Sequence, residues 1–69
     1  MKLSARNTIP GKITRIIVGP VSAEVTLTVA PGIDIVSVIS SASVKQLGLA
    51  EGASAYAVIK ASSVMVGVD

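Results

Sequence analysis

Residues 21–29 have the sequence VSAEVTLTV, in which apolar and polar side chains alternate without a break. This period of two is typical of a strand with one buried face, and the β-branched residues favour the same structure. The stretch therefore predicts a central strand of a β-sheet, and the other elements are arranged around it.

Four further strands are predicted from apolar runs bounded by Gly, Pro or Ser. They cover residues 12–18, 33–39, 53–60 and 64–68. Within the run 33–39 the apolar phase shifts between Ile35 and Val36, which indicates a bulge or a strand buried on both faces. The chain is thus expected to be rich in strands.

A short helix is predicted between the third and fourth strands. Ser41–Gly48 begins with hydroxyl side chains suited to an N-cap, carries Val44 and Leu47 on one face, and ends in glycine. This order predicts an all-β fold, a five-stranded OB-like barrel with one short helix between strands 3 and 4. An SH3-like barrel fits the same pattern, which does not separate the two.

The composition of the chain limits its chemistry. Its 69 residues include no His and no Cys, so the commonest general base, the commonest metal ligands and the thiolate nucleophile are absent. The four carboxylates are far apart in sequence and form no recognisable acid/base pair or metal motif. We therefore predict a binding protein, not an enzyme, with no cofactor and no metal cation ligands.

Charge and hydropathy limit its partners. The net charge is +2, the basic residues form no run, and Tyr56 is the only aromatic residue, so nucleic-acid binding is not expected. Charged residues interrupt every apolar run before the ~20 residues of a membrane span, and no secretory signal opens the chain. We expect a cytoplasmic protein without membrane partners.

The chain is also small and apolar. It is 51% hydrophobic and has a mean hydropathy of +0.77, yet a chain of about 60 residues buries only roughly 60% of the surface that it exposes when unfolded. Part of the apolar surface should therefore lie between subunits, which predicts a homo-oligomer.

Hydroxyl side chains cluster near isolated cations in three segments, which are residues 4–7 (SARN), 40–43 (SSAS) and 60–63 (KASS). Hydroxyls, free backbone N–H groups at a helix start and one or two cations can enclose a small oxyanion. Each segment also has an ordinary interpretation, as an N-cap or as a solvated surface charge. The glycine-rich phosphate loops of nucleotide-binding proteins are absent.

The sequence resembles the molbindins, small molybdate-binding proteins built from the TOBE-type domain. The resemblance covers essentially the whole chain and implies a single TOBE/Mop-type domain over residues 1–69. It is carried by Ser4–Asn7, Gly11–Ile13, Ala23–Val25, Ile39–Val44, Leu47–Leu49, Glu51-Gly52 and Ile59–Val64.

The resemblance implies an OB-like subunit assembled as a hexamer, a trimer of dimers, with oxyanions held between subunits. Mapped by motif, the oxyanion-binding residues that it implies are Ser4, Arg6, Ser40, Ser43 and Lys60. Molbindins commonly have Thr at the position of Ser40, so the hydroxyl is kept here and a methyl group is lost.

Together these observations predict a protein that binds molybdate at subunit interfaces for intracellular storage and homeostasis. Tungstate, which has nearly the same size and charge, should bind to the same donors. Two alternatives remain open. One is an oligomeric β-barrel interaction module, and the other is a binder of sulfate or phosphate. Phosphate carries a proton near neutral pH and needs an acceptor, whereas sulfate differs from molybdate in size.

Overall fold

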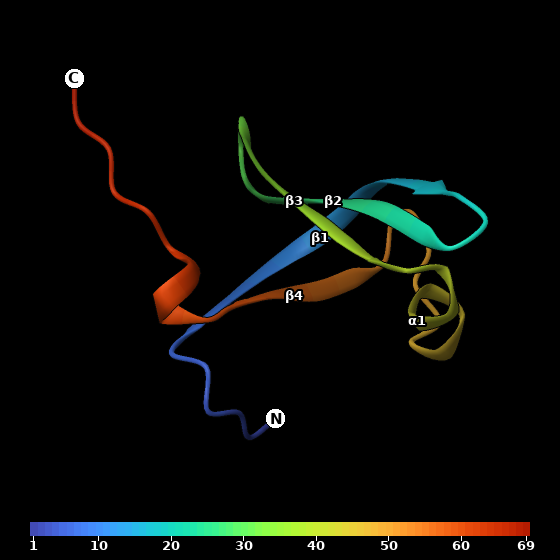
Figure 1. The fold of residues 1–69 in the computed structure, drawn as a ribbon. Coiled ribbons are helices and arrows are strands. Elements are labelled where there is room, and N and C mark those ends of the chain that lie inside the picture. The colour runs from blue at the N-terminus through green and yellow to red at the C-terminus, as the bar shows by residue number, and fades with distance from the viewer.

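The structure, a computed structural model, describes residues 1–69 (Figure 1). It contains four strands, one short α-helix and one 3-10 helix. In chain order the elements are β1 (Asn7–Val18), β2 (Ser22–Ala30), β3 (Ile33–Ser40), α1 (Ser41–Gln46), β4 (Ser54–Ile59) and η1 (Ala61–Ser63). The predicted all-β class, with a helix between the third and fourth strands, is confirmed.

The four strands form one antiparallel sheet in the order β3-β2-β1-β4. Strand β2 lies inside the sheet, as its alternating sequence predicts. Its side chains Ala23, Val25 and Leu27 are buried, whereas Ser22 before them and Glu24 between them are exposed. This alternation gives the sheet one apolar face, around which the core forms.

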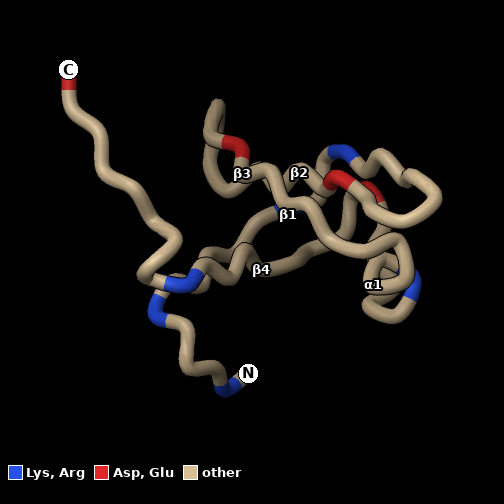
Figure 2. Tube along the Cα trace, viewed as in Figure 1, with Lys and Arg blue, Asp and Glu red and all other residues tan.

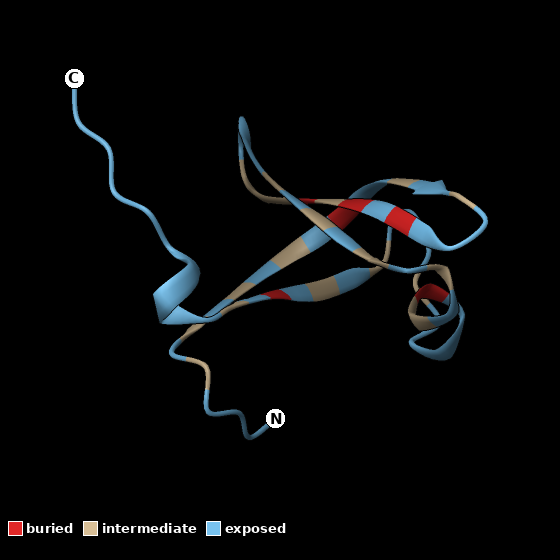
Figure 3. Ribbon diagram, in the orientation of Figure 1, coloured by how far each residue is buried: buried red, intermediate tan, exposed pale blue.

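The core of the single chain is small. Figure 3 shows how few positions are buried, and they are Ile13, Ala23, Val25, Leu27, Val44 and Ala57. The sheet curls around this cluster into a half-barrel. Residues of β3 and β4 line the same apolar cavities, so the two edge strands face each other across an open seam.

The prediction of a fifth strand over residues 64–68 is wrong for the single chain. Helix η1 turns the chain after β4, and residues 64–69 run away from the sheet to the C-terminus (Figure 1). Met65, Val66 and Val68 are more than 90% exposed. Apolar β-branched residues favour a strand only where a partner edge is available, and no edge of this chain lies against the segment.

The predicted irregularity between Ile35 and Val36 is also absent. Strand β3 pairs with β2 in an unbroken register from Asp34 to Ser40, and the irregularities lie elsewhere, between Ile13 and Arg15 of β1 and between Thr28 and Ala30 of β2. Apolar residues occur at successive positions of β3 because the side chains that point away from the core include valines. Val36 and Val38 remain exposed on the outer face.

Helix α1 lies where the sequence predicts a short helix, but it ends at Gln46, and Leu47, which was expected beside Val44 on the apolar face, is the exposed C-cap. Ser40 is the N-cap, with its side chain accepting the backbone N–H of Ser43. Gly48 follows the helix with a φ of 63°, a left-handed conformation that glycine adopts without steric cost. Val44 is the buried residue of the helix. Neither helical segment has the length and apolar content needed to cross a membrane.

Candidate functional site

The N-terminal segment and the end of β4 together form an open groove. Its lining includes Ser4 and Arg6, which precede β1, and Lys60 and Ser62, which follow β4. Three of the five site residues predicted from the sequence are therefore brought together, although Ser4 and Lys60 are 56 positions apart in the chain. In Figure 2 two basic positions lie next to each other in this region.

The pairing of β1 with β4 explains this meeting. The two strands are antiparallel, and their last partners at this end are Asn7 and Ile59. Continuing the same register by one position sets Arg6 opposite Lys60. Ser4 lies two residues before Arg6, and Ser62 lies in the 3-10 helix η1 that follows Lys60, so both hydroxyls line the same groove.

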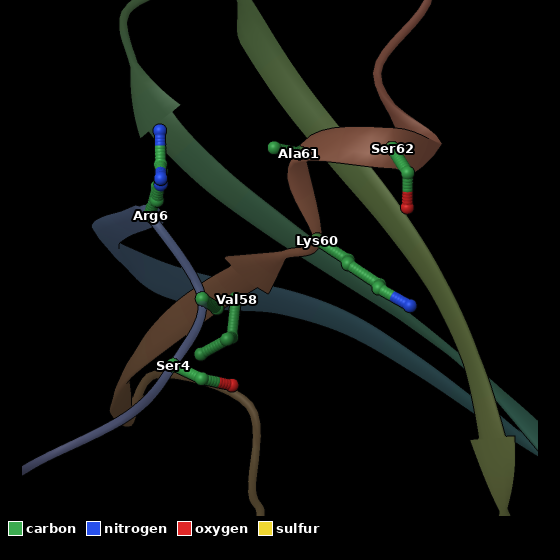
Figure 4. Close-up of a pocket in the computed structure, with 7 residues that line it drawn as sticks. Ser4, Arg6, Val58, Lys60, Ala61 and Ser62 are labelled. Carbon is green, nitrogen blue, oxygen red and sulfur yellow. The ribbon is translucent and has the colours of Figure 1, made fainter.

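The side chains of the groove do not converge in the single chain. Figure 4 shows the Lys60 and Ser62 side chains pointing to one side, whereas the Arg6 side chain points away from Lys60. All of these side chains are exposed. The groove lining contains no carboxylate, so its charge is positive.

A second polar cluster lies at the start of α1. The hydroxyl oxygens of Ser40 and Ser43 are 2.7 Å apart, and Ser40 Oγ accepts the Ser43 backbone N–H at 3.0 Å. Ser41 donates its hydroxyl to the Gly19 carbonyl oxygen at 2.7 Å, and its backbone N–H bonds the carbonyl of Val21. The turn between β1 and β2 thus holds the helix start in place.

The two clusters lie at opposite ends of the sheet. The groove adjoins the Asn7 end of β1, whereas Ser40 pairs with Ser22 near the Val18 end, and Figure 1 shows η1 and α1 far apart. A strand as long as β1 spans roughly 35 Å. One small anion hydrogen-bonds over about 3 Å, so within one chain no oxyanion contacts Ser40, Ser43 and the cations together.

Three residues near these clusters were not predicted as site residues. Ser62 lines the groove from the 3-10 helix that follows Lys60. Asn7 bonds across to Ile59, and Ser41 anchors the helix. Their roles depend on strand register and tertiary contacts, for which the sequence carried no signal.

No group of three or more His, Cys, Asp or Glu side chains is placed to hold a metal ion. The donors that the structure offers are hydroxyl, guanidinium and ammonium groups, all of which donate hydrogen bonds to oxygen acceptors. The fold and the groove thus define a small β protein with an open, positively charged site.

Comparison with known proteins gives the family. The TOBE domain matches residues 3–66, and the chain therefore belongs to the TOBE domain family. It is 49% identical over 69 residues to a Haemophilus influenzae protein named "Probable molybdenum-pterin-binding protein", and the match covers 100% of both chains.

Solved structures agree with this assignment. The MopII protein of Clostridium pasteurianum superposes with a TM-score of 0.90 at 45% identity, covering 97% of this chain and 100% of that one. The cytoplasmic molybdate-binding protein ModG, in a crystal form with molybdate bound, superposes with a TM-score of 0.93 at 49% identity. That match covers 100% of this chain and 49% of ModG. These relatives are binding proteins.

Proposed function

We propose that this chain binds molybdate, and tungstate equally well, for intracellular storage and homeostasis, without catalysing a reaction. The observation that carries the proposal is the groove that brings Arg6 and Lys60 together beside serine hydroxyls. Molybdate is a tetrahedral dianion that only accepts hydrogen bonds, and these groups can all donate to it. The names of the relatives, and the molybdate bound to ModG, support this choice of anion.

The complete site is formed between copies of the chain. Ser4, Arg6 and Lys60 of one subunit provide the cations and a hydroxyl, and Ser40 and Ser43 of another provide the donors at the helix start. The separation of the two clusters in one chain supports this arrangement. It also brings the Arg6 and Lys60 side chains to a common ligand that neither reaches in the open groove.

The assembly is a hexamer, a trimer of dimers. Each copy exposes apolar side chains that a monomer would leave in water, among them Val36, Val38 and Val66. The five-stranded barrel is completed in the hexamer, when residues 64–68 of one copy pair with an open sheet edge of another. Strand addition of this kind satisfies the free backbone groups of the edge and covers the apolar seam.

The whole of residues 1–69 acts as a single TOBE/Mop-type domain in the cytoplasm. The domain match over residues 3–66 and the description of ModG as a cytoplasmic protein support both statements. The protein has no nucleic-acid or membrane partner in this proposal.

Isothermal titration of the protein with molybdate, tungstate, sulfate and phosphate tests the function. We expect tight binding of molybdate and tungstate with similar affinities, and much weaker binding of the other two anions. Phosphate carries a proton near neutral pH, and the groove lining offers no carboxylate to accept it.

Two outcomes would contradict the proposal. Equal or tighter binding of sulfate would make the chain a general oxyanion binder. No heat with any of the four anions, together with an oligomeric mass, would favour the interaction module instead.

A further inference from the structure

The β1–β4 ladder ends where its next pair would bring two positive charges together. Asn7 and Ile59 are the last partners, and the next position in the register sets Arg6 opposite Lys60. Like charges directly opposite each other on an antiparallel pair destabilise it. Both strands end here, with β1 beginning at Asn7 and β4 ending at Ile59.

One side-chain hydrogen bond opposes the separation of these strand ends. The Asn7 side chain donates from Nδ2 to the Ile59 carbonyl oxygen at 3.2 Å, and the contact is partly buried. The Ile59 carbonyl belongs to the peptide group that continues into Lys60, and the donating Nδ2 belongs to the side chain of the residue that follows Arg6. At the last pair of the ladder, this side-chain bond therefore joins the two segments that carry the cations.

We propose that Asn7 is a positioning residue of the oxyanion site. Its carboxamide holds the Arg6 and Lys60 segments side by side against the repulsion of their charges, so that only the two side chains have to turn toward the anion when it binds. Asn7 does not line the groove, and it acts through the two cations without touching the anion. This inference rests on the proposed function of the groove.

The substitution Asn7→Leu tests it, because leucine keeps the size of the side chain and removes the amide donor. Isothermal titration with molybdate should give a dissociation constant raised roughly threefold to tenfold, the usual effect of one lost hydrogen bond. The matched control is Thr14→Val, which removes the bond between the Thr14 and Thr28 hydroxyls. Thr14 also lies on β1 but away from the groove, and its substitution should leave the dissociation constant unchanged.

A double-mutant cycle separates positioning from a general loss of stability. In a Lys60→Ala background one of the two cations is gone, and Asn7→Leu should then change the dissociation constant by less than about twofold. The thermal midpoint of each variant is measured in parallel. Should the leucine variant fail to fold, Asn7→Ala takes its place in the same cycle.

An equal loss of affinity from Asn7→Leu in both backgrounds would overturn the positioning role, as would a loss no larger than that of Thr14→Val. The proposed function fails differently, since it requires Arg6→Ala and Lys60→Ala to weaken binding on their own. If these two single variants bind molybdate normally, Asn7 has no cations to position and both proposals fall. If they bind weakly while Asn7→Leu binds normally, only the present inference falls.

Discussion

The hydroxyl oxygens of Ser40 and Ser43 lie 2.7 Å apart, and Ser40 Oγ also accepts the Ser43 backbone N–H. One hydroxyl must donate to the other, so the pair keeps a single hydroxyl proton for a ligand, and the internal bond polarises that proton. Ser40 is the N-cap of the helix as well, whereas the cap does not use the Ser43 side chain. The two residues can therefore be distinguished by mutation.

We predict that Ser40→Ala lowers the free energy of unfolding by about 1 kcal/mol, because the helix loses its N-cap. Ser43→Ala should leave stability unchanged, since Ser40 still accepts the Ser43 backbone N–H and alanine favours the helix. Both variants should bind molybdate more weakly, by about threefold to tenfold for the lost hydroxyl. Denaturant unfolding and isothermal titration measure the two effects. Unchanged affinity in Ser43→Ala would remove the hydroxyl pair from the site.

Removing a cation of the groove should weaken molybdate binding more than removing a hydroxyl. We predict that Arg6→Ala and Lys60→Ala each weaken molybdate binding by about tenfold to more than a hundredfold, since a hydrogen bond to a charged group contributes about 1.5–3 kcal/mol. Lys12→Ala is the control, because it removes the same charge from a residue that does not line the groove. A similar loss in the control would mean that only the net charge attracts the anion.

The sequence predicts those parts of the fold that depend on local pattern. The alternation of residues 21–29 defines β2, and the serines and Gly48 define both ends of α1. The strand predicted over residues 12–18 begins earlier in the structure, at Asn7, and includes Pro10, which cannot donate to a ladder. Strand β1 pairs with β2 only from Lys12 onward, so Pro10 lies where β1 has a single neighbour and is tolerated there.

The site was predictable residue by residue but not as an arrangement. The chemistry of hydroxyls and cations indicates an anion without any structure. The meeting of Arg6 with Lys60 depends on the register of β1 with β4, and the distance of both from Ser40 depends on the length of β1. The prediction of a fifth strand is wrong for a related reason, because the local pattern of residues 64–68 does not encode whether a partner edge lies beside them, and no edge of the single chain does.

We predict that the protein is a hexamer in solution. Sedimentation equilibrium at micromolar concentration should give a mass close to six times the 6.9 kDa of one chain. Val66 is 91% exposed in the single chain, so an acidic residue there would be harmless to a monomer. If Val66 lies between copies, Val66→Asp should lower the measured mass. Ala50→Asp, in an exposed turn, serves as the control. A monomeric wild-type protein would exclude a site shared between copies.

The donor set of the proposed site determines how molybdate binding depends on pH and salt. The chain has no His and no Cys, the side chains whose charge most often changes between pH 6 and 8, and molybdate stays a dianion over that range. The dissociation constant for molybdate should therefore be nearly constant from pH 6 to 8 at fixed ionic strength.

Added salt should weaken binding only modestly, because an anion enclosed between subunits is poorly screened. Isothermal titrations across both ranges measure these dependences. A tenfold change with pH would require a titrating group in the site and would contradict a site made of hydroxyls, Arg6 and Lys60. A steep loss with salt would indicate that the anion is held at an open surface.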